Sequence, residues 1–345
     1  MKKARFQEIT SEYARLKIGV LGDFSLDRYL EIDPALGETS IETGLPVHNV
    51  VNVRGQPGAA GTILNNLVAL GVKAAYPVGF CGKDGEGYEL QHALRAKGPS
   101  VPIDYFLATP HRRTFTYCKP LLIRPGRGPE ELSRLDTKNW TPTPRVIEET
   151  LIDSVRRLVG EVDALIVLDQ VDVAETGVVT RRVLEALHEA SQARPDLLIL
   201  ADSRRGVKGW PPLTFKMNVN ELASMMGQSR PLAESEVGGL AKEFARQTAR
   251  VVFVTMAERG MMAASPEGRV ERVDCVPPRG EIDVVGAGDS VTANLAVALA
   301  AGAGLREAIE LANTAASIVI HQLGTTGTAS VTQLEELLVG SMTLA

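Results

Sequence analysis

Two acidic residues enclose a run of small residues in the segment Asp283-Val-Val-Gly286-Ala287-Gly288-Asp289. Residues without bulky side chains let backbone N–H groups approach an anion, and the apolar spacing of the following VTANLAVALA predicts a helix. The amides of residues 286–288 would then lie at a helix N-terminus, which favours phosphate. Asp289, beside that phosphate, could accept the proton of an attacking hydroxyl. From these residues alone, a glycine-rich turn capped by Asp289 explains the pattern equally well.

Short apolar runs alternate with longer amphipathic stretches from about residue 145 onward. Runs with apolar character on both faces are typical of buried parallel strands, and the amphipathic stretches predict crossover helices. The predicted strands are 17–23, 164–169, 197–202 and 251–256, and the predicted helices are 145–160, 176–192 and 232–248, with a surface helix before residue 17. This order predicts a doubly wound α/β fold with a mostly parallel sheet.

Polar residues follow the apolar runs at Asp23, Asp169, Asp202 and Thr255. In open α/β sheets, ligands bind beyond the carboxyl ends of the strands. We therefore expect these side chains along one ligand-binding edge, with Asp169 among the substrate-binding residues. Each of them could instead be a helix N-cap or a turn residue.

Two regions, about 28–55 and 104–137, contain strand-like pieces with no helix long enough to cross over between them. They predict a small β-sheet lid within one domain spanning 1–345. An isolated small sheet exposes an apolar face, so pairing with a second lid is expected, and with it a homodimer.

The chain of 345 residues carries 37 basic and 42 acidic residues, a net charge of −5. A weakly acidic protein does not attract nucleic acid at long range, so we expect no such partner. We expect a cytoplasmic protein without a membrane partner, because no stretch reaches the roughly 20 apolar residues of a membrane span and the charged opening is unlike a signal peptide. Cys81, Cys118 and Cys275 have neither zinc-site spacing nor a disulfide pattern, which predicts reduced thiols.

Four motifs resemble, in order, those of the ribokinase/PfkB family of carbohydrate kinases. They are LGDFSLDRY at 21–29, PGAAGTILNNLVALG at 57–71, KMNVNEL at 216–222 and DVVGAGDS at 283–290. The resemblance implies a ribokinase-like fold and transfer of the γ-phosphoryl group of ATP to a hydroxyl of a sugar or sugar phosphate.

The same resemblance implies roles for individual residues. Asp27 would bind sugar hydroxyls, and Gly58, Thr62 and Asn66 would lie in or under the sugar pocket. Asp289 would be the catalytic base, with the amides of residues 286–288 as the anion hole.

On the nucleotide side, the resemblance implies that Asn218 and Glu221 hold Mg²⁺ and organise the phosphates of ATP. Thr255 and Gly260 would lie beside phosphate or ribose, and Asn313 beside adenine, although small residues around Asn313 also suit close helix packing. Whether a monovalent cation such as K⁺ binds near Asp283 is left open. Lys216 is given no catalytic role and is interpreted as a helix-surface residue.

Within the family, the chain is most similar to heptose-phosphate kinases, through GDxxLDRY, Arg134-Leu-Asp, Glu258-Arg-Gly-Met and Leu323-Gly-Thr. Ala59 and Thr62 depart from the usual Gly and Asn, so the sugar itself is left open. Arg112 or Arg113, with Arg113 favoured, would contact a phosphate already on the substrate, because guanidinium groups bind phosphate in a bidentate manner. A solvated pair on a lid strand is an equal alternative.

We therefore expect a phosphotransferase that uses ATP and Mg²⁺, with a heptose-phosphate-like acceptor favoured. The alternative is a non-catalytic sugar- or nucleotide-binding regulatory protein on the same fold. A nicotinamide-dependent enzyme is disfavoured, because GAGD lies near the C-terminus and no GxGxxG opens the first βα unit.

Overall fold

The main sheet of the computed structural model, which describes residues 1–230 and 232–340, has nine strands. In spatial order they are β16 (Val270–Val273), β15 (Met261–Ala264), β14 (Val252–Thr255), β13 (Thr214–Asn218), β12 (Leu198–Ser203), β11 (Ala164–Asp169), β1 (Lys17–Gly22), β6 (Ala74–Gly82) and β7 (Phe106–Thr109). The strands from β14 to β7 run parallel to one another, and β15 and β16 form an antiparallel edge. The predicted strands thus exist and lie in one sheet.

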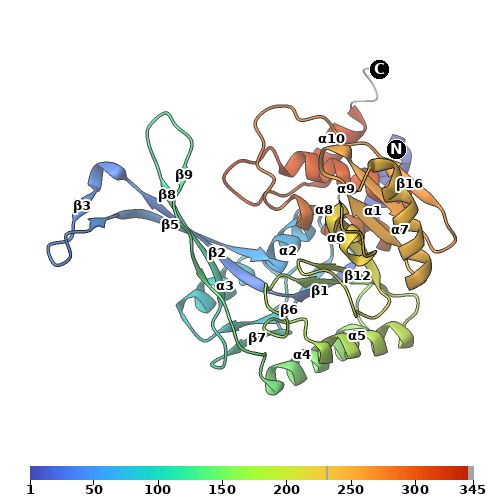
Figure 1. Ribbon diagram of the computed structural model, residues 1–345, viewed down its shortest axis with the longest axis horizontal. Helices are drawn as coiled ribbons and strands as arrows, with labels where there is room; N and C mark the ends of the chain where they lie inside the picture. Colours follow the sequence, from blue (N-terminus) through green and yellow to red (C-terminus); the bar gives the residue numbers. More distant parts are fainter. Residues whose placement is uncertain (231, 341–345) are drawn as a thin grey trace.

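Helices cover both faces of this sheet (Figure 1). One layer contains α1 (Lys3–Ser11), α2 (Ala60–Ala69), α3 (Gly85–Arg95), α8 (Ala287–Ala300), α9 (Leu305–Val319) and α10 (Val331–Leu338). The other contains α4 (Arg145–Leu158), α5 (Arg181–Ala193), α6 (Val219–Met225) and α7 (Glu234–Thr248). The prediction of a doubly wound α/β fold is confirmed. Among the described residues, no helix is both long and apolar enough to cross a bilayer.

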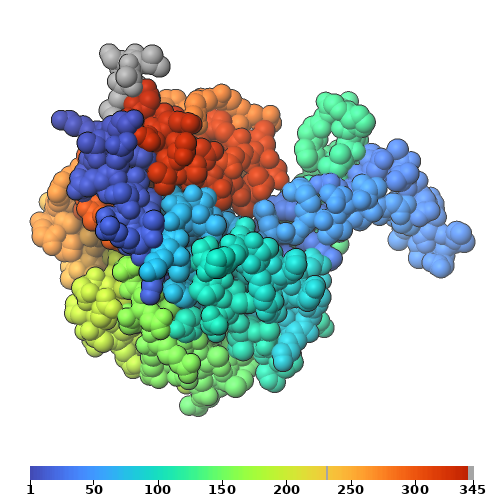
Figure 2. All heavy atoms as spheres, turned by 180° about the vertical axis from the view of Figure 1, so that it is seen from behind, coloured from blue at the N-terminus to red at the C-terminus, as the bar shows by residue number. Residues whose placement is uncertain are grey.

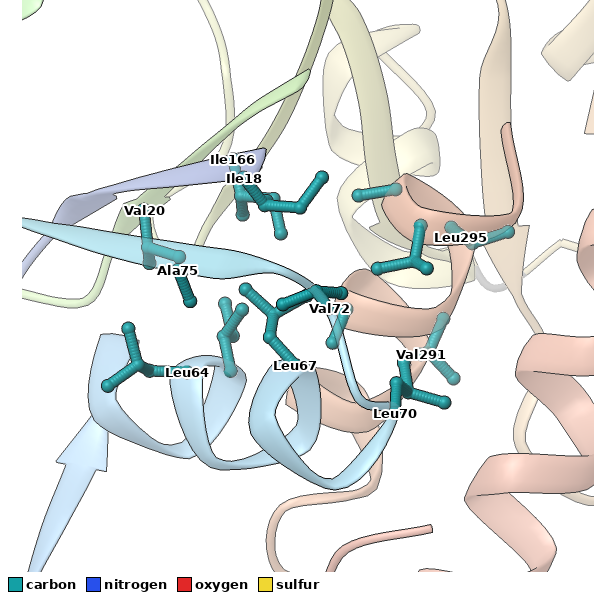
Figure 3. Packing of buried hydrophobic residues seen from close by; sticks show 14 of the residues in the cluster. Ile18, Val20, Leu64, Leu67, Leu70, Val72, Ala75, Ile166, Val291 and Leu295 are labelled. Atoms are coloured by element: carbon teal, nitrogen blue, oxygen red, sulfur yellow. The ribbon is translucent and has the colours of Figure 1, made fainter. Parts of the chain in front are cut away.

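Two hydrophobic cores follow from the alternation of side chains along buried strands. On β11, Ala164, Ile166 and Leu168 belong to the core under α2 and α8, whereas Leu165 and Val167 belong to the core under α4 and α5. In the first core, Leu64 and Leu67 of α2 point toward the strand that carries Ala75, and Leu70 lies beside Val291 of α8 (Figure 3). The packing of α2 on α8 fixes the start of α8 relative to the sheet.

A second, smaller sheet stands beside the main one. Its strand order is β10 (Leu135–Thr137), β8 (Phe115–Leu122), β2 (Phe24–Ile32) and β5 (Val50–Ala59), with β9 (Glu130–Glu131) paired to β8. The chain between β2 and β5 forms an arm that carries β3 (Glu38–Thr39) and β4 (Pro46–Val47). In both views of the molecule this arm projects beyond the body (Figures 1 and 2).

The boundaries of this sheet differ from the predicted segments 28–55 and 104–137. Strands β2 and β5 extend beyond the first segment at both ends, and Phe106–Thr109 is not part of the small sheet. It forms β7, the edge strand of the main sheet, because it pairs in parallel with β6 from Gly79 onward. A four-residue apolar strand looks the same in either sheet until its partner is known.

Strand register gives the small sheet two different faces, since paired residues project to the same side. One face carries Asp27 and Tyr29 of β2, with Tyr117 and Lys119 opposite them on β8. Strand β5 completes this polar face with Gln56 and Arg54. The other face carries Leu30, paired with Val53 and Pro120, and Leu135, paired with Cys118.

Replacing Leu67 with Ala should destabilise the fold by about 2–5 kcal/mol, because Leu67 is fully buried between α2, β6 and α8 and the truncation leaves a cavity. Leu36→Ala is the matched control: this leucine is 53% exposed, so the change should cost no more than about 0.5 kcal/mol. Urea denaturation of the two variants measures both values. Equal stabilities would contradict the assignment of Leu67 to the core.

Candidate active site

The segment GAGD begins α8, as the sequence predicts. Gly286 is the N-cap residue with φ of +84°, a conformation that favours glycine, and a Cβ at this position would lie 3.3 Å from the Thr326 side chain. The Ala287 N–H donates to the Val284 carbonyl at 3.2 Å, so it already has a partner within the turn. Gly288 is the second helical residue, where an N–H group has no intrahelical acceptor. Of the three predicted amides, that of Ala287 is therefore engaged within the turn, and that of Gly288 is at a position open to an anion.

Asp289 lies in the first turn of α8 and is partly accessible. Burial among protein atoms, together with the charges of Asp202 and Asp27 and against the opposing effect of Lys216, raises the pKa of its carboxyl to about 7. A carboxyl with a pKa near neutrality suits proton transfer at physiological pH. The residue predicted as the base thus has a perturbed acidity and sits between charged groups from three other elements.

Lys216 is not on a helix surface, so that part of the sequence interpretation is wrong. It lies on β13 and is only 8% exposed, and its Nζ donates to Asp202 Oδ2 of β12 at 2.7 Å. The Thr292 hydroxyl of α8 donates to the same oxygen at 3.3 Å. The sequence could not distinguish this buried pair from a surface lysine, because β12 and β13 become neighbours only in the sheet.

Asn218 and Glu221 form a capping box at the start of α6. The Asn218 side chain accepts from the Glu221 N–H at 2.9 Å, and Glu221 Oε2 accepts from the Asn218 N–H at 2.7 Å. Each group therefore has a structural role, but Asn218 is exposed and Glu221 keeps a second carboxylate oxygen. These oxygens are of the type that Mg²⁺ prefers. Among the described residues there is no cluster of three or more His, Cys, Asp or Glu side chains suited to a metal, so a cation here would depend on water or a ligand for its other contacts.

A cavity of about 780 Å³ lies beside the N-terminus of α8. Five predicted cofactor-binding residues line it: Asn218, Thr255, Gly260, Gly288 and Asn313. Its remaining wall is largely apolar and includes Val219, Met256, Pro277, Ile282, Val284 and Ile320. This combination of an apolar wall with a few polar groups is typical of a site for a heterocyclic ligand with a polar tail.

Three of these lining residues have defined local roles. The Thr255 hydroxyl donates to the Met217 carbonyl at 3.4 Å, and the Asn313 amide nitrogen donates to the Asp274 carbonyl at 2.6 Å. A Cβ at Gly260 would lie 2.1 Å from the Val273 carbonyl oxygen, so only glycine fits at this turn. Thr255, Asn313 and Gly260 therefore hold the backbone of the cavity wall in place, in addition to lining the cavity.

Asp27 lies on the polar face of the small sheet and is 5% exposed. Lys119 Nζ contacts its carboxylate and the Tyr29 hydroxyl at 3.5 and 3.4 Å, and lies 4.9 Å from the centre of the Tyr29 ring. A Cβ at Gly58 would lie 2.1 Å from Asp27 Oδ1, which explains the glycine there. Burial raises the pKa of Asp27 despite the opposing charge of Lys119. Sequence reasoning missed Lys119, which no motif marks.

Thr62 and Asn66 are 1% and 0% exposed within α2, so direct contact with a sugar would require this helix to be uncovered. The Asn66 amide donates to the Thr62 carbonyl at 3.0 Å and lies 3.5 Å from the Gly327 carbonyl. Gln56 of β5 donates to the Thr326 hydroxyl at 2.8 Å. The loop around Thr326 thus contacts the small sheet, α2 and the Gly286 turn together.

Asp169 is fully buried at the end of β11, and its Oδ2 accepts from the Ser203 hydroxyl at 2.7 Å and from Arg205 at 2.8 Å. Neighbouring Asp23 accepts from the Gln170 and Val178 N–H groups at 2.8 and 2.7 Å. Both acids therefore hold the loop beyond the strand ends. For Asp169 the structure favours this positioning role over an open contact with a substrate.

Arg112 and Arg113 point to different surroundings. The Arg112 guanidinium is buried and donates to the Thr141 hydroxyl and carbonyl, both at 2.9 Å, and to the Pro142 carbonyl. The Arg113 side chain is exposed and acts electrostatically on Asp84 before α3. A substrate contact by Arg113 therefore stays a prediction.

Comparison with known proteins agrees with this arrangement. Residues 171–332 match the model of the pfkB family carbohydrate kinases. The bifunctional protein HldE of Rhodospirillum rubrum is 30% identical over 320 residues, which cover 92% of this chain and 61% of HldE, and that of Gluconobacter oxydans is 27% identical over 311 residues, covering 90% and 62%. The chain thus spans about three fifths of the length of these relatives.

Solved structures show the same fold at lower identity. A ribokinase from Arabidopsis thaliana, complexed with ribose and ATP, superposes with a TM-score of 0.65 at 17% identity, covering 94% of this chain and 99% of the ribokinase. Phosphofructokinase-2 from Escherichia coli, in complex with fructose-6-phosphate, gives 0.69 at 17% identity, with 95% and 99% covered. The family match over residues 171–332, the HldE relatives along most of the chain and the ribokinase-like fold agree with one another: residues 171–332 carry a pfkB family carbohydrate kinase domain.

Proposed function

We propose that the protein transfers the γ-phosphoryl group of ATP to a hydroxyl of a sugar or sugar phosphate, with Asp289 as the catalytic base. One observation carries this proposal: Asp289 lies at the helix N-terminus beside the 780 Å³ cavity, within electrostatic reach of Asp27 on the small sheet. A base must lie between the phosphoryl donor and the acceptor hydroxyl. Asp289 would lie between the two, because its neighbour Gly288 lines the cavity and the charge of Asp27 acts on its carboxyl.

The nucleotide is assigned to the cavity because its apolar wall suits a purine and because the cavity reaches Gly288 at the start of α8. The α8 N-terminus would receive the phosphates, where the N–H of Gly288 and the helix dipole favour negative charge. Glu221 and Asn218 are the residues that would hold Mg²⁺, directly or through water. When bound, Mg²⁺ would neutralise phosphate charge and orient the leaving group. A requirement for K⁺ near Asp283 stays a prediction.

The acceptor is assigned to the polar face of the small sheet. Asp27 and Gln56 offer hydrogen-bonding groups for hydroxyls, and Tyr29 and Tyr117 offer flat surfaces for a sugar ring. Cations stand against both rings: Lys119 4.9 Å from the centre of Tyr29, and Arg134 5.0 Å from that of Tyr117. Cations at this position favour an acceptor that already bears a phosphate, which agrees with the likeness of the motifs to heptose-phosphate kinases.

Asp289 can act as a base only when ionised, and it removes the proton from the acceptor hydroxyl as the oxygen attacks. Asp27 would hold a neighbouring hydroxyl and thereby orient the attacking oxygen. The small sheet would exclude water from the reacting groups, which prevents hydrolysis of ATP in place of transfer.

We further propose a homodimer in which the apolar faces of two small sheets meet. Val53 and Leu135 on this face are 47% and 66% exposed, and Leu45 and Ile41 on the arm are 64% and 102% exposed. Large exposed apolar side chains gathered on one projecting sheet are typical of an interaction surface. The partner that fits this surface is a second copy of the chain. Pairing of two small sheets would cover their apolar faces and leave the polar face of each sheet open toward the active site of its own copy.

Asp289→Asn should fold normally and lose at least about a hundredfold in kcat, because the amide cannot accept the proton. The measurement is ADP release from Mg-ATP with a panel of sugars and sugar phosphates that includes heptose 7-phosphate. Asp153→Asn is the matched control, since this acid is 64% exposed in a surface ion pair on α4 and is not assigned the proton. Full activity of Asp289→Asn would refute the base, and ATP binding without turnover of any acceptor would favour a regulatory protein.

The pH profile should show the titration of Asp289. Because burial raises its pKa to about 7 and the ionised form is the active one, kcat/KM should rise with pH, by about tenfold from pH 6 to pH 8. Initial rates with an unphosphorylated acceptor avoid the titration of a substrate phosphate, and thermal melting at each pH checks that the protein stays folded. A flat profile over this range would contradict the raised pKa.

Val53→Asp combined with Leu135→Asp should convert the dimer to a monomer, because two charges would be buried at the interface. Light scattering after size exclusion should give about twice 37.0 kDa for the wild type and 37.0 kDa for the variant. Val146→Asp on α4 is the control, being 56% exposed on the body of the protein. A wild-type protein that elutes as a monomer at working concentration would count against the dimer.

A further inference from the structure

A buried ion pair lies directly beneath the first turn of α8. Lys216 Nζ is 2.7 Å from Asp202 Oδ2, and the two residues are both only 8% exposed. Lysine is seldom buried at this level, because removing an ammonium from water is costly even when it is paired. A hydrophobic pair would hold β12 to β13 without that cost, so the charge calls for another explanation.

The ammonium faces the point where the phosphate is proposed to bind. A Cβ at Gly288 would lie 3.4 Å from Lys216 Nζ, which places the charge next to the open end of α8. Asp202, Glu221 and Asp289 are the acidic groups within electrostatic reach of this ammonium. The ammonium is therefore kept charged among three acids that come from β12, α6 and α8.

An ammonium has three N–H donors, and Asp202 receives one of them. An anion at the α8 N-terminus could take a second without breaking that pair. Thr292, four residues after Gly288 on α8, also donates to Asp202 and so links the ion pair to the helix. The Lys216–Asp202 ion pair is thus held in a fixed position relative to the start of α8.

We propose that Lys216 is a catalytic residue that contacts the γ-phosphoryl group of the nucleotide during transfer and that Asp202 positions it. This inference rests on the proposed kinase function. In the transfer, the bond from the γ-phosphorus to the β–γ bridging oxygen breaks, a bond from the acceptor oxygen to the γ-phosphorus forms, the acceptor proton goes to Asp289 and ADP leaves. Negative charge on the moving phosphoryl oxygens is then stabilised by an ammonium that needs no reorganisation.

Two properties separate this role from a merely structural one. A residue that contacts the γ-phosphate distinguishes ATP from ADP, whereas a residue that only holds two strands together does not. Lys216 also lowers the pKa of Asp289, so its removal should shift the acid limb of the pH profile, while the charges of Asp202 and Asp27 continue to raise the pKa of Asp289. Both properties can be measured on the folded protein.

The experiment compares Lys216→Met and Lys216→Arg with the wild type. Calorimetric titration with a non-hydrolysable ATP analogue and with ADP, each with Mg²⁺, should show Lys216→Met losing about tenfold to a hundredfold in affinity for the analogue and less than about twofold for ADP. In turnover assays, kcat should fall by at least about a hundredfold, the acid limb should shift to higher pH, and Lys216→Arg should recover part of both losses.

Equal weakening of both nucleotides, or unchanged kcat in Lys216→Met, would overturn the inference. If Lys216→Met does not fold, the affinities for the ATP analogue and for ADP are compared in Lys216→Arg and Asp202→Asn instead, since each of these variants retains a polar group in the buried space. If the wild type phosphorylates no acceptor, the proposed function fails, while the difference between ATP analogue and ADP still tests the contact of Lys216 with the terminal phosphate.

Discussion

The candidate active site depends on the compensation of buried charge at the carboxyl edge of the main sheet. Asp23, Asp169 and Asp202 all lie at strand ends and are nearly inaccessible to water. Uncompensated burial of a carboxylate costs several kcal/mol, so each of them needs donors from neighbouring elements. Asp23 receives backbone N–H groups, Asp169 receives Ser203 and Arg205, and Asp202 receives Lys216 and Thr292. These contacts fix the loops and the helix start around an otherwise open pocket.

The small sheet shows how one strand pattern can serve two partners. Because side chains alternate across a strand, β2 presents Asp27 and Tyr29 to one side and Leu30 to the other. Its polar side reaches toward the body through Gln56, which contacts both Thr325 and Thr326 of the C-terminal loop. The same loop contacts Gly286, so a movement of the small sheet that displaces this loop would also displace the start of α8. One loop therefore links the small sheet to the start of α8.

Several residues that the motifs single out have structural partners of their own. Asn218 and Glu221 cap α6, Asn313 holds the Asp274 carbonyl, and Asp169 is saturated on one oxygen by Ser203 and Arg205. Such double use is physically reasonable, because a group that is held by its own fold is already oriented when a ligand arrives. It also explains why a motif position alone does not separate a ligand contact from a residue that shapes the pocket.

The sequence by itself determined four strands of the main sheet, their crossover helices and the resemblance to the pfkB family. Apolar runs of six residues and amphipathic spacing gave the parallel strands and crossover helices, and the small residues before Asp289 predicted the helix start, because both signals are local in the chain. Only the tertiary structure decided which strands are neighbours. It moved Phe106–Thr109 into the main sheet, buried Lys216 against Asp202, set Lys119 beside Asp27 and buried the Arg112 guanidinium against Thr141. Those contacts join residues far apart in sequence, and their energies depend on burial and on charge at close range, neither of which exists until the sheets have formed.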